Sequence, residues 1–247
     1  MMEFQQQQHQ RLDIVPTIAT AVDMMRASRY SETMDLLRSG LGHLLSLAER
    51  AAPISPSPFS CSCSSDTSIS LESVSLRLCE EDDDETSKHH FFGASAFGAL
   101  AIYDKALRFA GETTDSIFGE GDNVHRASSV LLYNTALVHH LLGLQGPHQQ
   151  RHLKKALKLY EMAIDVLHNC KKHNDVDKMI TLAIFNNKGH VYCQFSELSH
   201  VQVCIDWLKS ILDCCDCDFQ NSDELLHFRL TVLLWDAENC PPAAPAA

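Results

Sequence analysis

Histidine and cysteine are the residue types in this chain whose spacing could support metal chemistry. His200 and Cys204 are four residues apart, so they would share one face of a helix. Three more cysteines occur within Cys214–Cys217, and two others are Cys61 and Cys63. Structural zinc sites usually need two matching ligand pairs, and no second matching pair is present. We interpret the cysteines as small apolar residues of a reducing compartment, and we predict no metal and no cofactor. A zinc-binding helical protein is a minor alternative.

Residues for acid–base or nucleophilic catalysis do not form a known arrangement. The sequence has no phosphate-binding glycine loop, no G-x-S-x-G elbow and no H-E-x-x-H helix. His139 and His140 are adjacent, but neighbours on a helix point about 100° apart and cannot act as one site. Glu112, Glu120 and Asp122 flank glycines, which is typical of a solvated loop. We therefore predict that the chain is not an enzyme.

Charge and hydropathy limit the classes of partner. The net charge is −12, and half of it comes from the acidic run Glu80–Glu85. A polyanion such as nucleic acid needs clustered Lys and Arg, so we predict no nucleic-acid partner. No apolar stretch reaches the roughly 18 residues of a membrane span. The polar segment Met1–Gln10 lacks the order of a secretory signal, which favours a cytoplasmic location, with the nucleus as an alternative.

Composition divides the chain into segments of different kinds. Residues 1–12 are Gln-rich and predicted to be disordered, and residues 13–50 predict a first helical hairpin. Residues 51–90 combine prolines, a Ser-rich stretch and the acidic run, so they cannot bury enough apolar surface to offset the entropy of ordering. We expect a disordered insertion there. Residues 91–236 predict a helical domain, and residues 237–247 a Pro/Ala tail.

Apolar periodicity predicts the helices that position any site. The first begins after Asp13, a plausible N-cap, and has Pro16 in its first turn, where a missing N–H is harmless. The other helices with a clear stripe are predicted at 31–50, 127–144, 152–170, 177–195 and 198–215.

Three stretches are ambiguous. Residues 99–109 fit either a helix or an extended segment. Asp223–Trp235 has Leu226, Leu230 and Leu233 at helical spacing, but its apolar residues also alternate as in a strand. One interpretation is a minor two-stranded β ribbon formed by residues 99–109 and 225–235. A transient element around Leu71–Cys79 is a further possibility within the insertion.

One spacing recurs in the second helix of each predicted pair. A small residue is followed by a bulky one four positions later, and by another small residue three positions after that. A small residue lets two helices approach, and the bulky residue fills the gap one turn later. The four copies are Thr33-Leu37-Gly40-Leu41, Ala99-Tyr103-Ala106-Leu107, Ala156-Tyr160-Ala163-Ile164 and Val201-Ile205-Leu208-Lys209.

The predicted first helices share a second spacing of two and three residues. Its copies are Asn134-Ala136-His139 and Asn187-Gly189-Tyr192, with a looser match at Ala19-Ala21-Met24. A glycine inside a helix costs about 1 kcal/mol against alanine, so Gly189 indicates a close helix contact.

Together these residues resemble the tetratricopeptide repeat. Phe185–Tyr192 is similar to the first helix of kinesin-light-chain-type repeats, and Ala156–Ile164 to the matching second helix. The resemblance covers about residues 14–50 and 127–215. It departs from the family period of 34 residues, because Asn134 and Asn187 are 53 apart. Gly143 and Ala156 are also too far apart, which predicts an enlarged turn at 144–152. The copy at Ala99–Leu107 lacks a first helix, so it is either a half repeat or a coincidence.

The resemblance implies an all-α fold, an array of α/α helical hairpins whose first helices line a concave groove. It further implies a protein or peptide partner, whose backbone Asn134 and Asn187 would hold, since a carboxamide both donates and accepts. The alternative for each Asn is to brace a neighbouring turn. A helical bundle within a larger assembly, with no discrete groove, is the second interpretation, and the oligomeric state stays open. The implied groove residues are Tyr133, Asn134, Leu137, His140, Asn186, Asn187, His190, Gln194 and Arg26, with Ile18, Val22, Met25, Val130 and Cys193 beside them.

Overall fold

A computed structural model describes most of the helical part of the chain. The described residues are 14–50, 70–76, 100–110, 121–145, 148–171, 174–214 and 223–239. They form seven helices and one two-stranded antiparallel sheet. The predicted all-α class with a minor ribbon is thus confirmed. The predictions of disorder at residues 1–12, and of a tail beyond residue 239, lie outside the described residues.

Six of the helices form three successive hairpins. Each first helix packs most extensively against the helix that follows it. The pairs are α2 (Ile14–Arg26) with α3 (Tyr30–Arg50), α5 (Gly121–Gln145) with α6 (Gln149–Leu167), and α7 (Asp175–Gln194) with α8 (Leu198–Asp213). The last helix, α9 (Asp223–Asn239), packs on α8.

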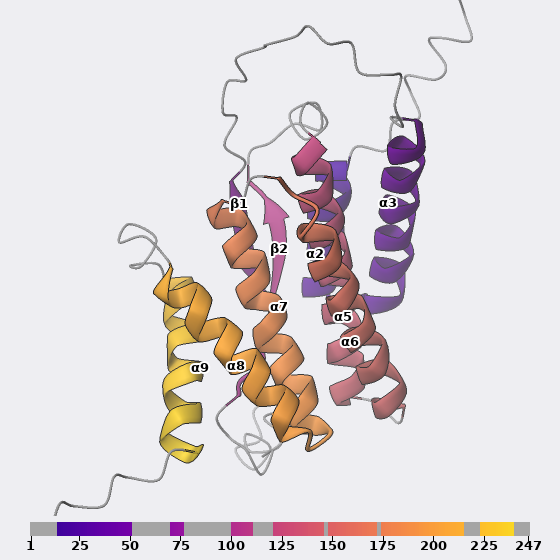
Figure 1. The fold of residues 1–247 in the computed structure, drawn as a ribbon. Coiled ribbons are helices and arrows are strands. Elements are labelled where there is room, and N and C mark those ends of the chain that lie inside the picture. Colours follow the sequence, from indigo (N-terminus) through magenta and orange to yellow (C-terminus); the bar gives the residue numbers. More distant parts are fainter. Residues whose placement is uncertain are drawn as a thin grey trace, which may run out of the picture.

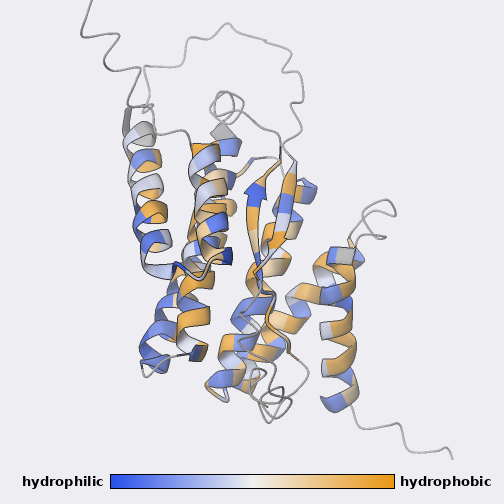
Figure 2. Cartoon of the chain, turned by 180° about the vertical axis from the view of Figure 1, so that it is seen from behind, coloured by the Kyte–Doolittle hydropathy of each residue, from blue (hydrophilic) through white to orange (hydrophobic). Residues whose placement is uncertain are grey.

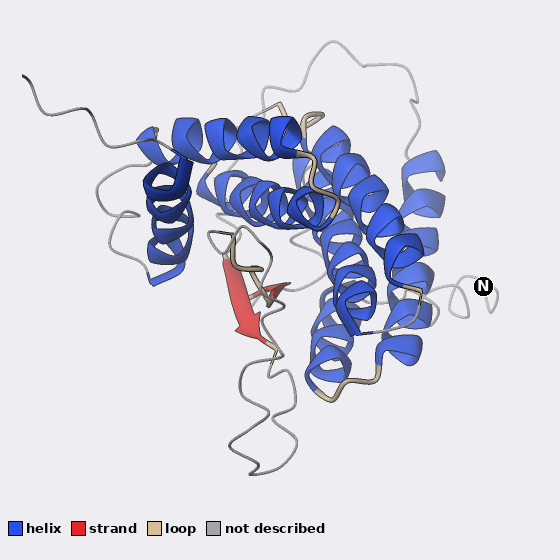
Figure 3. Cartoon of the chain, turned by 90° about the horizontal axis from the view of Figure 1, so that it is seen from below, coloured by secondary structure: helices blue, strands red, loops and turns tan. Residues whose placement is uncertain are grey.

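The hairpins stack into a curved array. Helix α3 packs against α5 and α6 packs against α7, so every hairpin touches the next (Figure 1). Seen from below, the helices form an arc, and the two strands lie on its inner side (Figure 3). The described helices therefore enclose the ribbon between α2, α5 and α7 without pairing with it as further strands.

Two hairpin turns are built alike. Ser28 and Ser196 have φ values of 55° and 58°, the left-handed region. Ser28 N–H donates to Met25 O at 2.9 Å, and the next amide donates to the carbonyl five residues back. Ser196 and its successor make the same two bonds to the end of α7. This pairing of bonds closes a helix C-terminus and reverses the chain.

The third hairpin turn is shorter than predicted. Helix α5 ends at Gln145 and α6 begins at Gln149, so only residues 146–148 separate them. The predicted enlarged turn at 144–152 is wrong, because the additional residues extend the two helices. At its other end α5 begins at Gly121, six residues before the predicted start.

The ribbon consists of β1 (Leu71–Ser75) and β2 (Lys105–Phe109). Ser73 lies opposite Leu107 in the antiparallel register. A strand near residues 99–109 was predicted, but its predicted partner near 225–235 is wrong, because that stretch is helix α9. The prediction of disorder is also wrong for residues 70–76, while residues 51–69 and 77–90 lie outside the described residues.

The match at Ala99–Leu107 to a second-helix spacing is therefore a coincidence. Tyr103, Ala106 and Leu107 are in extended backbone, not in a helix, and all three are buried. A strand that is buried on both faces has no polar face, so its apolar residues can fall at helical spacing by chance.

Helices α5 and α7 are buried around most of their circumference. In α7, buried residues continue from Val176 to Cys193 with few breaks. A helix with apolar residues on all sides must be covered on all sides. Here outer helices cover one side and β2 covers the other, which explains why polar residues on the inner side face a strand and not solvent.

Helix α9 is covered on one side only. Leu225, Phe228 and Trp235 are buried against the array. Its remaining large hydrophobic residues are exposed, and they lie among the hydrophobic bands of this helix in Figure 2. They are Leu226, Leu230, Leu233 and Leu234, exposed by 54%, 47%, 63% and 51%.

Candidate functional site

The inner sides of α5 and α7 hold the backbone of β2 through side-chain amides. On α5, Asn134 Oδ1 accepts the N–H of Leu107 at 3.0 Å. Its Nδ2 donates to the carbonyl oxygen of the same residue at 2.8 Å. One carboxamide thus satisfies both backbone groups of one strand residue, as a neighbouring strand would.

Helix α7 repeats this arrangement four strand residues earlier. Asn187 Oδ1 accepts the N–H of Tyr103 at 2.8 Å, and its Nδ2 donates to Tyr103 O at 3.0 Å. The adjacent Asn186 donates from Nδ2 to Ala101 O at 3.0 Å. Asn134 and Asn187 are fully buried, so these bonds form away from water. The two asparagines that shared one predicted repeat position therefore perform the same task.

Tyr133 completes the row of contacts. Its hydroxyl donates to Lys105 O at 2.9 Å. Residues 101, 103, 105 and 107 therefore present backbone groups to the helices, while the alternate residues pair with β1, as in Leu76 N–H donating to Asp104 O at 3.2 Å. We call Tyr133, Asn134, Asn186 and Asn187 the carboxamide groove.

One carboxamide of the groove is only half used. Asn186 is fully buried, and its Oδ1 has no hydrogen-bond partner among the described residues. The Nε2 of His227, whose ring lies 5.2 Å from that of Tyr103, is likewise buried without a partner in the described part of the chain. A buried polar atom without a partner is unfavourable by about 1–3 kcal/mol. Two such atoms beside β2 mean that the strand leaves part of its surroundings unsatisfied.

Glu224, in the first turn of α9, reads the side chains of β2. Its carboxylate accepts from the Tyr103 hydroxyl at 2.5 Å and from Lys105 Nζ at 3.0 and 3.1 Å. The hydroxyl of Ser73 on β1 donates to the same carboxylate. The Tyr103 ring packs 4.8 Å from that of Phe228.

The electrostatics of this contact follow from its burial. Burial, together with the Glu224 carboxylate, raises the pKa of Tyr103 far above its ordinary range, so the phenol stays protonated and can donate. Burial opposes ionisation of Glu224, but the hydrogen bonds from Ser73, Tyr103 and Lys105 outweigh it and lower the pKa of that carboxyl. Glu224 is consequently an anion that holds three donors.

The predicted histidines lie deeper between the same helices. His140 Nε2 and His190 Nδ1 are 2.9 Å apart, and His140 Nδ1 is 3.4 Å from the Tyr160 hydroxyl. Burial lowers the pKa of His190 to about 4 and that of His140 well below its usual value, so both rings are neutral at pH 7. They join α5 to α7 and do not contact β2 by any bond described here.

The other predicted groove residues are divided between core and surface. Leu137 is fully buried. Arg26 is exposed, and Gln194 is partly exposed at the end of α7, so neither belongs to the carboxamide groove. The apolar positions Ile18, Val22, Met25, Val130 and Cys193 are all buried in the core.

A buried ion pair fixes the spacing of the two groove helices. Arg126 of α5 donates to both carboxylate oxygens of Asp177 on α7, at 2.7 and 3.0 Å. Asp177 also accepts the N–H of Asn174 at 3.1 Å, while the Asn174 side chain caps the third residue of α7. The pair thus ties the start of one helix to the start of the next.

Sequence reasoning did not find Glu224. It lies in a stretch whose helical or extended state was open, and its partners are more than 100 positions away along the chain. Its acidic side chain in the first turn of a helix is an ordinary feature. The apolar alternation of residues 225–235 drew attention to this stretch, but for the wrong reason.

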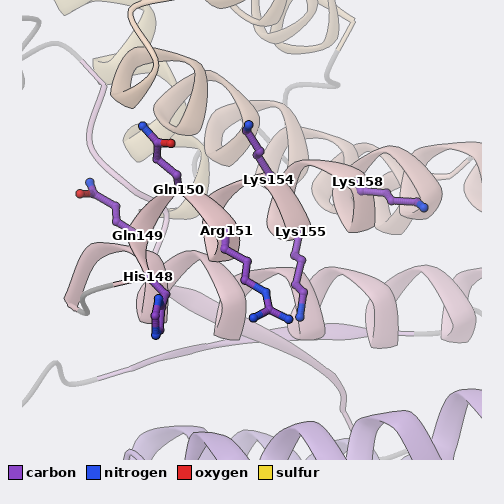
Figure 4. A pocket seen from close by; sticks show the side chains of 7 residues that line it. All are labelled: His148, Gln149, Gln150, Arg151, Lys154, Lys155 and Lys158. Atoms are coloured by element: carbon purple, nitrogen blue, oxygen red, sulfur yellow. The ribbon is translucent and has the colours of Figure 1, made fainter.

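A basic stripe on α6 is a separate surface feature. Arg151, Lys154, Lys155 and Lys158 are exposed, and none forms an ion pair with another described residue. They border an open depression with His148, Gln149 and Gln150. In Figure 4, Arg151 and Lys155 point one way, whereas Lys154 points another. The cations therefore do not converge on one small ligand.

Two further observations concern metals and membranes. Within the described ranges, no three His, Cys, Asp or Glu side chains are grouped so that they could hold a metal ion. Cys170, Cys193 and Cys204 are buried free thiols, and Cys214 is exposed. Among the described helices, none combines the length and the hydropathy needed to cross a membrane.

Comparison with known proteins gives no relative. No family model matches the chain, and neither a curated protein nor a solved structure is similar to it. Arguments about its function therefore rest on its own residues and geometry.

Proposed function

We propose that this chain is a non-enzymatic interaction scaffold with tetratricopeptide-like hairpins, which binds an extended segment of a partner protein in the carboxamide groove. The observation that carries the proposal is the pair of bonds that Asn134 and Asn187 each make to one backbone residue. These bonds address the backbone and not a particular side chain. Recognition of an extended peptide by main-chain bonds, with pockets for alternate side chains, is a common mode of peptide binding.

The spacing of the contacts supports this proposal. Tyr103 and Leu107 are four residues apart, about 13 Å in an extended strand. The two asparagines come from successive hairpins, so one carboxamide per hairpin addresses every fourth residue of the strand. A stacked array offers such a repeat naturally, whereas a single helix cannot.

Affinity capture with paired variants tests the proposal. The full chain and an Asn134→Ala/Asn187→Ala variant are used as baits, and recovered proteins are compared by mass spectrometry. We expect the double variant to lose the proteins that the wild-type chain captures. Ser129→Ala is the matched control, because it removes a buried 3.0 Å bond to Ala163 O between α5 and α6, away from β2. Equal loss with this control would contradict a role for the groove.

A structural subunit of a larger assembly is the second candidate. The exposed leucines of α9 favour it, because contiguous apolar surface on a soluble chain often marks a contact with another protein. In that case Leu230→Glu would abolish capture, and the groove variants would retain it.

A further inference from the structure

We infer that the partner of the carboxamide groove is an extended segment with the side-chain pattern of β2, and that it binds by exchanging with β2. This inference rests on the proposed function. The pattern is a tyrosine, a basic residue, an aliphatic residue and an aromatic residue at alternate positions, as in Tyr103, Lys105, Leu107 and Phe109. The internal strand is thus a copy of the ligand that the groove accepts.

The surroundings of each side chain define this pattern. The tyrosine position offers the ring of Phe228 and the carboxylate of Glu224. The basic position offers the same carboxylate, with Lys105 Nζ also lying 5.8 Å from the Tyr103 ring centroid. The aliphatic and aromatic positions are closed: Leu107 is fully buried and Phe109 is only 4% exposed. An acidic residue at the basic position would face Glu224.

Exchange is favoured over simple addition, because the groove is already filled. Every backbone group of the groove-facing row that a partner would use is bonded to β2. A partner that replaces β2 residue for residue refills the same buried positions, so the core is not left open. The two unsatisfied atoms, Asn186 Oδ1 and His227 Nε2, leave room for improvement, since a partner can supply donors that β2 lacks.

The tether explains why exchange would be regulated. A strand joined to its own groove acts at an effective concentration that is typically of order millimolar for a short flexible connection. A free peptide with an intrinsic Kd of about 1 μM would therefore appear about a thousandfold weaker against the intact chain. Weakening β2 should reveal the intrinsic affinity.

A peptide-rescue experiment tests the inference. A fluorescent peptide with the sequence of residues 100–110 is titrated against the full chain and against its Tyr103→Ala variant, with anisotropy as the readout. We expect binding to the variant at least tenfold tighter than to the wild-type chain. A peptide with alanine in place of its tyrosine should lose at least tenfold in affinity, because the emptied position is then not refilled. Equal, weak binding of both peptides to a folded Tyr103→Ala variant would overturn the inference.

A charge reversal tests the specificity of the basic position. A peptide with glutamate in place of its lysine should bind the Tyr103→Ala variant poorly. We expect the additional substitution Glu224→Lys to restore binding of this peptide and to weaken that of the original one. If Glu224→Lys weakens both peptides equally, Glu224 does not read the ligand and this part of the pattern is wrong.

Native-state hydrogen exchange tests the exchange step without any variant. The amides of Tyr103 and Leu107, which donate to Asn187 and Asn134, report whether β2 leaves the groove as a unit. We expect these amides to exchange through an opening that is more frequent than global unfolding, as measured by the amides of α5 and α7. If they exchange only on global unfolding, β2 is a permanent part of the core and the inference fails. The proposed capture of a partner would then have to use another surface, so the two failures are distinguishable.

Discussion

At the scale of single residues, the carboxamide groove uses asparagine where a sheet would use another strand. Each of Asn134 and Asn187 matches the donor and the acceptor of one backbone unit. No other common side chain except glutamine offers both groups in one plane. Aspartate accepts but cannot donate when ionised, and leucine would leave both backbone groups unsatisfied.

We predict that Asn187→Ala lowers the free energy of unfolding by about 2–4 kcal/mol. The substitution removes two buried hydrogen bonds and leaves the N–H and the carbonyl of Tyr103 without partners, at about 1–3 kcal/mol each. Urea unfolding followed by circular dichroism measures the loss. Asn169→Ala is the control, because the Asn169 side chain makes one exposed bond to Asp165 O, and it should change stability by less than about 0.5 kcal/mol. An equally small effect of Asn187→Ala would mean that the groove contributes nothing to the fold.

The His140–His190 pair predicts loss of stability in mild acid. The pKa of His190 is lowered to about 4, and that of His140 is also lowered, both mainly by burial. Each unfolded histidine binds a proton near pH 6.5, while the folded one stays neutral until lower pH. Stability is therefore fully present above about pH 6.5 and falls towards pH 4, with a slope of about 1.4 kcal/mol per pH unit for each histidine.

Urea midpoints between pH 7.5 and 4.5 measure this slope. His190→Gln should make it shallower by about one histidine's contribution. His168→Gln is the matched control, because His168 is exposed at the end of α6 and removes no buried ring. An unchanged slope in His190→Gln would show that the acid sensitivity has another source, such as the Arg126–Asp177 pair.

At the scale of elements, the hairpin turns are closed by serines in a conformation that suits glycine. A left-handed residue with a Cβ is strained by about 1–2 kcal/mol, part of which glycine recovers. We predict that Ser28→Gly and Ser196→Gly each raise the free energy of unfolding by about 0.5–1 kcal/mol. Thermal unfolding measures the gain. Ser210→Gly, in an exposed position within α8, should lower stability by a similar amount, so the two outcomes have opposite signs.

Glycines inside the helices separate close contact from chance. A Cβ on Gly143 would lie 2.8 Å from Leu153 Cγ, whereas a Cβ on Gly42 would meet nothing within 4 Å. We predict that Gly143→Ala destabilises by about 1–3 kcal/mol through overpacking of α5 on α6. Gly42→Ala should instead stabilise by about 0.5–1 kcal/mol, since alanine is the better helix former. Denaturant unfolding of both variants checks the signs, and a gain for Gly143→Ala would mean that the two helices can separate at little cost.

Local sequence signals predicted the helices well and the ribbon poorly. Periodic apolar stripes and caps place a helix to within a few residues, as in Leu198–Asp213, because the pattern lies within the element itself. The pairing of β1 with β2 depends on contacts with α2 and α5, which no local pattern records. Leu71–Ser75 is short, and serines precede and follow it, so its composition indicated disorder. The groove asparagines were found because they share a repeat position, whereas Glu224 shares none.

At the scale of the whole molecule, the array curves around the ribbon and ends in a helix with two different faces. Leu225 is fully buried and its neighbour Leu226 is 54% exposed. We predict that Leu225→Ala destabilises by about 2–4 kcal/mol, as for a buried leucine, while Leu226→Ala changes stability by less than about 0.5 kcal/mol. Equilibrium unfolding of the two variants compares them directly. Similar small losses would mean that α9 is not an integral part of the array.

The order in which the ribosome makes these residues follows from the position of β2 in the chain. The partners of β2 come later: Asn134 is 27 residues beyond Leu107, Asn187 is 84 beyond Tyr103, and Glu224 is 119 beyond Lys105. At about 5–20 residues per second, the strand waits roughly 6–24 s for its last partner to be synthesised. During that time an apolar strand is without most of the groups that will cover it. The newly made chain therefore passes through a period in which chaperones, or a neighbouring nascent copy, compete with its own helices for residues 101–109.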